Sequence, residues 1–267
     1  MDIADLFARV VAAPVHHVAE ETALQRASLL SDKLGCQVWL KREDLQPVFS
    51  FKLRGAYARM SRMCPEERRQ GVVAASAGNH AQGVALAAQR LGMRACLVMP
   101  RTTPGIKVEA VRRLGAQVIL DGDAFDAAEA RARLECEQRG AVYIHPFDDP
   151  DVIAGQGTVA LELLRQLPQR PDAVFIPVGG GGLLAGMAAV IKTVSPTTRV
   201  IGVEPDGAAS FAAALRAGQP VDIGPVNLFA DGVAVRRVGA WPFRLAAPLV
   251  DEMLAVSVDA SRLSFQA

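Results

Sequence analysis

A single stretch decides the fold: Val174-Phe175-Ile176-Pro177-Val178-Gly179-Gly180-Gly181-Gly182-Leu183-Leu184-Ala185-Gly186. An apolar strand runs into four consecutive glycines and then into a helix rich in alanine and leucine. Glycines let backbone N–H groups approach an anion closely, and a helix N-terminus adds the positive end of its dipole. The stretch therefore predicts a phosphate-binding loop. A flexible turn is the alternative, which four glycines at one strand-to-helix junction disfavour.

The same alternation of strand and helix extends along the chain from about residue 38. Continuous apolar runs separated by amphipathic helices are typical of parallel sheets that are covered on both faces. These runs are residues 72–75, 96–99, 118–120, 142–144, 174–178 and 200–203. With 267 residues the chain is long enough for two domains, and prolines and polar residues at 145–150 interrupt the pattern. We expect an α/β protein with two open, mostly parallel sheets.

Composition excludes several classes of function. The apolar fraction of 51% is typical of a globular protein. The net charge is only +1, and the sequence has no basic stripe that would favour binding of nucleic acid. The N-terminal residues form no signal peptide, and no apolar run reaches membrane-spanning length. The cysteines form no C-x-x-C pair, which favours free thiols in a reducing compartment; they are Cys36, Cys64, Cys96 and Cys136. We expect a cytoplasmic protein that binds neither nucleic acid nor a membrane.

Lys52 is the first candidate catalytic residue. It lies in the run Phe49-Ser50-Phe51-Lys52-Leu53-Arg54-Gly55-Ala56, just past a predicted strand at 38–42. A lysine between apolar neighbours at a strand-to-helix junction can lose part of its hydration, which lowers its pKa as a Schiff-base lysine requires. The charged residues before it, 41–44, are expected to be solvated or paired with one another.

A third junction follows the predicted strand 72–75 and reads Ser76-Ala77-Gly78-Asn79-His80. Small residues there leave backbone amides exposed at the next helix N-terminus, where a substrate carboxylate can bind. The Asn79 amide offers both a donor and an acceptor for a ring oxygen. Ordinary helix capping by Ser76 or Asn79 is the alternative. We give His80 no catalytic role, and the adjacent His16 and His17 make a poor metal pair, so no metal site is expected.

A dinucleotide-binding enzyme is a competing interpretation. The glycine stretch also satisfies G-x-G-x-x-A at Gly180, Gly182 and Ala185, and Glu204 ends the next predicted strand. An NAD(P)-dependent oxidoreductase would use such a carboxylate to bind a ribose. That interpretation leaves Lys52 and Asn79 without a role. An inactive, shortened interaction partner is a third hypothesis.

Four segments together resemble one family of enzymes. Residues 41–46, 50–56, 75–83 and 177–183 are similar to those of threonine dehydratases (threonine ammonia-lyases), in particular the biosynthetic form. These belong to the tryptophan-synthase-β-like, or fold type II, pyridoxal-phosphate enzymes. The stretches 106–108, 152–158, 202–204 and 229–235 agree as well, so the match covers residues 10–258.

The resemblance implies a cofactor, a reaction and an arrangement of domains. Residues 1–52 and 148–267 would form a large domain that binds pyridoxal 5'-phosphate, and residues 53–147 a small domain that binds the substrate carboxylate, with the active site between them. The reaction would be elimination from L-threonine and L-serine, giving ammonia and 2-oxobutanoate or pyruvate, as the first step toward isoleucine. A homo-oligomer is implied.

The resemblance also assigns roles to individual residues. Lys52 would hold the cofactor covalently, next to Phe51. The cofactor phosphate would lie on Gly179, Gly180, Gly181, Gly182 and Leu183. Asn79 would face the ring oxygen. The substrate carboxylate would be framed by Ser76, Ala77, Gly78, Asn79 and His80.

Two positions distinguish relatives within the family. Serine racemases carry a second serine where this chain has Ala77, and that hydroxyl serves as the acid on the opposite face. Cysteine and threonine synthases would show aspartate where this chain has Leu53. The resemblance therefore implies elimination in preference to racemisation.

The C-terminal residues depart from the family pattern. The catalytic part of the family continues into an A-E-P-S-G-A-like segment whose Ser or Thr contacts the pyridine nitrogen. This sequence ends at Ala267, and residues 260–266 match nothing in the family. We expect the pyridine-nitrogen partner and the regulatory domain to be missing from it, and apolar surface to be exposed.

Overall fold

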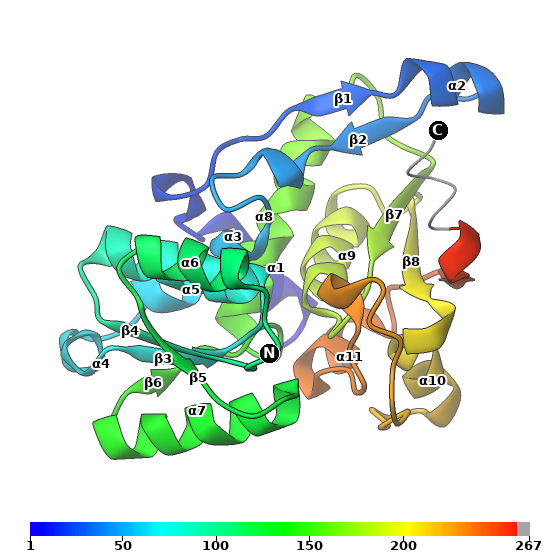
Figure 1. The fold of residues 1–267 in the computed structure, drawn as a ribbon. Helices are drawn as coiled ribbons and strands as arrows, with labels where there is room; N and C mark the ends of the chain where they lie inside the picture. Colours follow the sequence, from blue (N-terminus) through cyan, green and yellow to red (C-terminus); the bar gives the residue numbers. More distant parts are fainter. Residues whose placement is uncertain (261–267) are drawn as a thin grey trace. The chain divides into compact units, whose positions relative to one another are not determined.

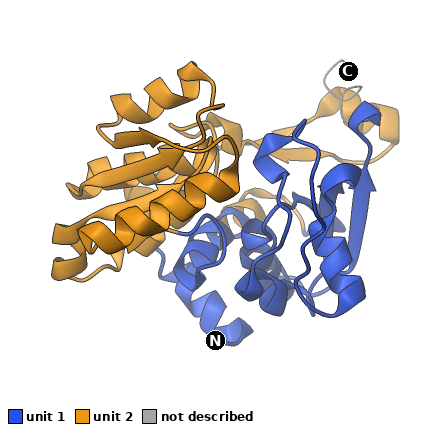
Figure 2. Cartoon of the chain, turned by 60° about the horizontal axis from the view of Figure 1, so that its bottom comes forward, with its two compact units in different colours: residues 1–13, 145–160, 170–267 blue, residues 14–144, 161–169 orange. Residues whose placement is uncertain are grey.

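The computed structural model describes residues 1–260 (Figure 1), so most of the unmatched segment 260–266 lies outside the described residues. The chain divides into two compact units (Figure 2). Unit 1 comprises residues 1–13, 145–160 and 170–267, and unit 2 comprises residues 14–144 and 161–169. These units differ from the predicted domains mainly at residues 14–52 and 161–169. The predicted division into domains stays a prediction.

Unit 2 is built on a four-stranded parallel sheet. Its strand order is β5 (Gln117–Leu120), β4 (Ala95–Met99), β3 (Val72–Ala75) and β6 (Val142–Tyr143). Helices α5 (Asn79–Leu91) and α6 (Gly105–Arg113) lie on one side of the sheet, and α7 (Phe125–Arg139) lies on the other (Figure 1). All four strands were predicted from the apolar runs.

The core of unit 2 follows from the alternation of side chains along a strand. Alternate residues of β3 and β4 point toward α7 and form one buried cluster: Val73, Ala75, Cys96, Val98, Ala128 and Ala132. The intervening residues point to the opposite face and are buried too; they are Val72, Ala74, Ala95, Leu97 and Met99. The prediction of a parallel sheet covered on both faces is therefore confirmed in unit 2.

The N-terminal part of unit 2 differs from the prediction. Strand β2 (Trp39–Lys41) exists, but it pairs antiparallel with β1 (Leu24–Arg26) and belongs to neither parallel sheet. A short connection containing α2 (Ser28–Leu34) returns the chain directly, which an antiparallel pair allows. Helix α3 (Lys52–Ser61) begins only after the 3-10 turn η2 (Glu43–Leu45) and residues 46–51. Lys52 therefore starts a helix, but the expectation that it directly follows a strand is wrong.

The other short elements of unit 2 lie on either side of these. The 3-10 turn η1 (Val15–His17) precedes β1, and α4 (Pro65–Gln70) joins α3 to β3. The side chains of α3 are almost all buried between their neighbours, with Leu53, Arg54, Ala56, Tyr57 and Met60 among them. Helix α3, which starts at the candidate catalytic residue Lys52, is therefore packed against other elements over most of its surface.

Unit 1 contains a three-stranded parallel sheet in the order β7 (Ala173–Pro177), β8 (Arg199–Pro205) and β9 (Glu252–Val256). Its helices are α1 (Ile3–Val11), α9 (Gly182–Val194), α10 (Ser210–Ala217) and α11 (Ala240–Ala246). The 3-10 turns η3 (Asp206–Ala208) and η4 (Asp231–Val233) complete it. Phe175 on β7 is 61% exposed, so coverage of both faces, as predicted, is wrong for this strand.

Helices α8 (Pro150–Gln166) and α9 touch through their backbones in unit 1. A Cβ atom at Gly186 of α9 would overlap the carbonyl oxygen of Ile153 and lie 2.6 Å from the amide nitrogen of Gly157. A Cβ atom at Gly157 would in turn lie 2.9 Å from the Gly186 oxygen. This crossing therefore admits only glycine at both positions.

Other expectations concern thiols, metals and membranes. Burial raises the pKa of Cys96, and that of Cys136 to about 11, so neither is a reactive thiolate. All four cysteines are free. Within residues 1–260, no cluster of three or more potential metal ligands occurs, and no helix is long and apolar enough to cross a bilayer.

Substituting Gly186→Ala should destabilise the protein, because the added methyl group has no space at the α8–α9 crossing. We expect a loss of about 1–3 kcal/mol in the free energy of unfolding, measured by urea denaturation. Gly105→Ala is the control, since a Cβ atom there has no neighbour within 4 Å. Equal stability of the two variants would contradict the close crossing.

Candidate active site

Lys52 is the first residue of α3 and is half-buried. Loss of hydration lowers the pKa of its amine to about 8. Its Nζ atom lies 5.4 Å from the centre of the Phe51 ring, so an aromatic face forms part of this environment. About a tenth of the amine is then neutral at pH 7, far more than for a solvated lysine. An amine in this state can act as a nucleophile or accept a proton.

Helix α5 lies directly against the backbone of Lys52. A Cβ atom at Gly83 would lie 2.9 Å from both the carbonyl carbon of Lys52 and the amide nitrogen of Leu53. Only glycine permits this approach without a shift of the α3 backbone. Residue 83 is within a stretch that resembles the family, but this contact was not predicted, because sequence alone does not show which helix packs on α3.

The predicted carboxylate loop begins where β3 ends and continues into α5. Ser76, Ala77 and Gly78 are half-buried, and Asn79 is exposed at the start of the helix. The Gly78 N–H donates to the Ser76 hydroxyl at 3.1 Å, which folds the loop tightly. Because α5 starts in this loop and contacts Lys52 at Gly83, one helix joins the two predicted segments of unit 2.

His80 is held in the core of unit 2. Its ring is buried, and its Nε2 atom lies 2.9 Å from the carbonyl oxygen of Ile144. Because a carbonyl only accepts hydrogen bonds, Nε2 is the donor in this hydrogen bond. The expectation of a buried, hydrogen-bonded histidine without a catalytic role is consistent with this placement.

A second lysine lies beside the same loop. A Cβ atom at Gly78 would be 3.8 Å from Nζ of Lys107, which belongs to α6. The ammonium group therefore adds positive charge next to Gly78 of the loop. Residues 106–108 belong to a stretch that resembles the family, but no role for Lys107 was predicted from the sequence.

The glycine loop lies in unit 1, between β7 and α9. Gly181 has φ of 89°, a conformation that side chains other than glycine rarely adopt. A Cβ atom at Gly180 would overlap the Phe147 ring, one at Gly181 would lie 2.9 Å from Cβ of Pro242, and one at Gly179 would lie 3.0 Å from Cα of Val233. Packing therefore excludes a side chain at Gly180 and Gly181 and crowds one at Gly179, which contradicts a merely flexible turn.

The backbone amides of this loop are arranged for an anion. The carbonyl oxygens of Gly180 and Gly181 accept hydrogen bonds from the amides of Gly239 and Ala185 at 3.1 and 2.9 Å. Among the described residues, no loop carbonyl or side chain accepts from the N–H groups of residues 180–183. These donors stand at the N-terminus of the thirteen-residue α9, where the helix dipole favours negative charge. A phosphate group fits this cradle.

Glu204 does not serve the role that a dinucleotide enzyme would give it. Its two carboxylate oxygens accept hydrogen bonds from the amides of Phe211 and Ala212, at 2.7 and 3.0 Å, in the first turn of α10. Burial raises the pKa of Glu204, and these two hydrogen bonds act in the opposite direction. The carboxylate caps a helix, so it supports no ribose site.

The charged residues before Lys52 are arranged differently from the prediction. Arg42 and Asp44 form the expected local pair, with Nη2 and Oδ2 2.7 Å apart. Lys41 instead binds Glu162 on α8 at 2.6 Å, and Glu43 binds the buried Arg54 at 2.7 Å. The expectation of solvated or locally paired charges is wrong for Lys41 and Glu43, because their partners are distant in sequence.

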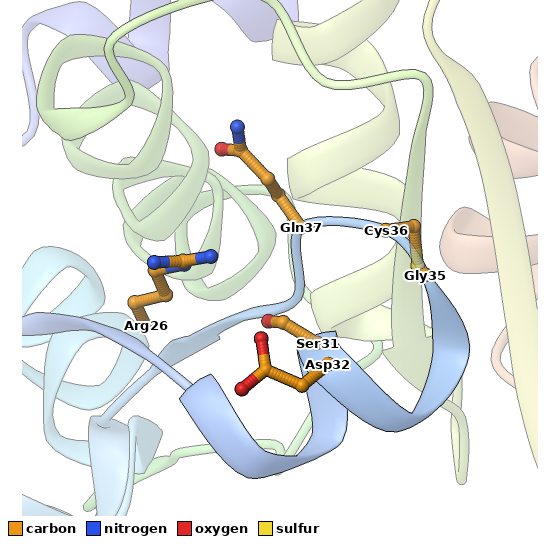
Figure 3. A pocket seen from close by; sticks show the side chains of 6 residues that line it. All are labelled: Arg26, Ser31, Asp32, Gly35, Cys36 and Gln37. Carbon is orange, nitrogen blue, oxygen red and sulfur yellow. The ribbon is translucent and has the colours of Figure 1, made fainter.

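A surface pocket lies elsewhere in unit 2, around α2 (Figure 3). It is lined by Arg26, Ser31, Asp32, Gly35, Cys36 and Gln37. The Ser31 hydroxyl there is already used, since it donates to the carbonyl of Ala27 and accepts from the amide of Val38. None of the predicted site residues lines this pocket.

Comparison with known proteins identifies the class. Residues 16–263 match the family of pyridoxal-phosphate dependent enzymes, and the chain belongs to that family. The match extends into residues 260–263, so the expectation that the whole segment 260–266 matches nothing in the family is wrong. It is 54% identical, over 94% of its length, to threonine dehydratase 1 biosynthetic, chloroplastic, of Solanum lycopersicum, and covers 41% of that protein. It is 51% identical, over 96% of its length, to the biosynthetic L-threonine dehydratase IlvA of Escherichia coli strain K12, and covers 50% of that protein.

Solved structures show the same fold. The processed form of threonine deaminase isoform 2 from Solanum lycopersicum has a TM-score of 0.93 and 52% identity; the match covers 96% of this chain and 74% of that one. A maize serine racemase has a TM-score of 0.91 and 33% identity, over 99% of this chain and 80% of that one. The predicted resemblance and fold class are confirmed. The chain spans half or less of the length of these two threonine dehydratases.

Substituting Lys52→Met should stabilise the protein at pH 7 in the absence of cofactor. Folding lowers the pKa of this amine to about 8 from the value near 10.4 of an unfolded chain. Below pH 8, protonation of the amine therefore favours the unfolded state and lowers the free energy of unfolding. The unfolded state binds more protons between pH 8 and 10, and stability of the native sequence therefore rises across that window.

Removing the amine should raise the free energy of unfolding at pH 7 by about 1–3 kcal/mol. The advantage should shrink as the pH rises from 8 to 10. Urea denaturation of both proteins across this range measures the difference. A Lys52→Met variant that is less stable at pH 7 would mean that the amine is not desolvated.

Proposed function

We propose that the chain is the catalytic part of a pyridoxal-phosphate enzyme that eliminates ammonia from L-threonine and L-serine. The products would be 2-oxobutanoate and pyruvate. The observation that carries the proposal is the desolvated amine of Lys52 at the start of α3, in a chain of this family with 54% identity to a biosynthetic threonine dehydratase. The glycine cradle at the N-terminus of α9 supports it independently.

The residues present fit the cofactor by their chemistry. In this proposal Lys52 binds it covalently beside Phe51, and the amides of residues 179–183 hold its phosphate. The Asn79 side chain faces its ring oxygen. When bound, pyridoxal phosphate supplies an electron sink for negative charge that develops at the substrate Cα.

The substrate carboxylate would lie on the loop 76–80, where Ser76 Oγ and the exposed amides at the start of α5 are the donors. Lys107 would add a positive charge beside Gly78. The Nζ atom of Lys52, partly neutral at pH 7, would accept the Cα proton. Loss of the β-hydroxyl as water, followed by hydrolytic release of ammonia, gives the 2-oxo acid.

Elimination is favoured over racemisation by Ala77. Racemisation requires a proton donor on the face of the substrate opposite Lys52, and the methyl group of Ala77 has none. The maize serine racemase is therefore a structural relative of this chain and not the model for its reaction. A place in isoleucine biosynthesis, a cytoplasmic location and a homo-oligomeric state stay predictions.

The proposal is tested by adding pyridoxal phosphate and L-threonine to the purified protein. We expect a visible absorbance band that depends on Lys52, together with formation of 2-oxobutanoate. Lys52→Ala should abolish both. The band without product would favour the inactive-partner hypothesis. Tight NAD binding without the band would favour an oxidoreductase.

Gly181→Ala should weaken binding of pyridoxal phosphate at least about tenfold, because the added methyl group lies 2.9 Å from Pro242 and forces the amides of the cradle to move. Gly218→Ala is a matched control: its φ is also positive, at 70°, but a Cβ atom there has no neighbour within 4 Å. Titration followed by absorbance measures both affinities. Equal affinities would contradict a phosphate site at this loop.

A further inference from the structure

Arg54 is a buried cation near the start of α3, two residues beyond Lys52. Its side chain is 0% exposed. Nε and Nη2 donate to the two oxygens of Glu43 at 2.7 and 2.8 Å, and Nη1 and Nη2 donate to the two oxygens of Glu162 at 2.6 and 2.9 Å. Two bidentate pairs therefore fix the plane of one guanidinium group.

The carboxylates that bind Arg54 are themselves held in place. Glu162 on α8 also accepts from Lys41 at 2.6 Å, and the same ammonium donates to the carbonyl of Thr22 at 2.7 Å and to Gln166 at 3.0 Å. All three protons of Lys41 are thus used. Glu43 accepts in addition from the Thr22 hydroxyl at 2.6 Å.

The charges within this group balance. Burial acts to lower the pKa of the Arg54 guanidinium, but the hydrogen bonds to Glu43 and Glu162 hold it above its usual value, so it stays charged. Two carboxylates oppose the cations of Arg54 and Lys41. Further titratable groups lie nearby: His16, with Nε2 3.8 Å from Glu162, and Glu21, which interacts electrostatically with Lys41.

The position of Arg54 on the helix gives this group a consequence for Lys52. Residues two apart on an α-helix point about 200° away from each other, so the two side chains leave α3 on nearly opposite sides. Fixing the guanidinium plane fixes the rotation of α3 about its axis, and with it the direction of Lys52. Gly83 sets the distance between α5 and the same turn of α3.

We propose that Arg54 is a positioning residue that holds Lys52 in its desolvated orientation through the rotation of α3. The proposal rests on the function proposed above for Lys52, although its geometry does not depend on the reaction. A buried ion group of this kind is weak as a source of stability, since apolar residues often replace one without loss. The planar guanidinium group of Arg54 binds Glu43 and Glu162 at the same time and so fixes its own orientation. The single ammonium group of a lysine cannot reproduce this geometry.

The test measures the titration of Lys52 in the full chain without cofactor. An amine-reactive acylating reagent modifies the neutral amine, and mass spectrometry of the peptide that contains Lys52 gives the extent of labelling at each pH. The native sequence should show a midpoint near pH 8. In Arg54→Lys the charge remains but the fork is lost, so Lys52 should regain water and the midpoint should rise by about one unit or more.

Glu135→Gln is the matched control. Glu135 is also a buried carboxylate of unit 2, and it accepts from Arg131 and Arg139, but it lies on α7 and not on α3 or α5. It should lose stability and keep the native Lys52 midpoint. If Arg54→Lys does not fold, Glu43→Gln removes one of the two carboxylates and is read by the same criterion.

An unchanged Lys52 midpoint in Arg54→Lys would overturn the proposal. An equal shift of the midpoint in Glu135→Gln would overturn it too, because the shift would then reflect a general loss of stability of unit 2. Added pyridoxal phosphate and threonine give a second readout. There kcat should fall at least tenfold in Arg54→Lys with little change in KM. If the native chain forms no product, the proposed reaction fails, while the labelling midpoint still decides the role of Arg54.

Discussion

Loss of hydration around the Lys52 amine is the constraint on which the rest of the proposed site depends. Desolvating a lysine opposes folding at neutral pH, so the surrounding structure must hold the residue in place. The approach of α5 at Gly83 and the almost complete burial of α3 provide that hold. The same α5 begins at the loop 76–80, so in the proposed function one helix would set the position of the amine and that of the substrate anion.

The phosphate cradle illustrates a different way of making a binding site. Neighbouring residues of unit 1 press on this loop, and Phe147 and Pro242 leave no space for a side chain at Gly180 and Gly181. Hydrogen bonds hold the carbonyl oxygens of Gly180 and Gly181, and among the described residues no acceptor is found for the amides at the start of α9. Rigid amides lose little entropy when an anion binds, which is why such a loop can anchor a cofactor that carries a phosphate.

Much of this could be predicted from the sequence, because the relevant signals are local. The apolar runs located every strand of the four-stranded sheet and strands β7 and β8 of the three-stranded sheet, but they missed β9, and the glycine run located the loop between β7 and α9. The same reasoning failed for residues 38–44. There the strand pairs antiparallel with β1, and the partners of Lys41 and Arg54 include Glu162, more than one hundred residues away. Charge pairs of this kind depend on tertiary packing, so they cannot be predicted from a local pattern in the sequence.

In the function proposed here, Lys52 is the residue that binds pyridoxal phosphate. The most direct measurement is to add the cofactor to the native protein, reduce the adduct with borohydride and locate the modified peptide by mass spectrometry. We expect the cofactor to be attached to Lys52, and free phosphate in excess to reduce the labelling by competing for the glycine cradle. Attachment to another lysine, or no attachment at all, would contradict it.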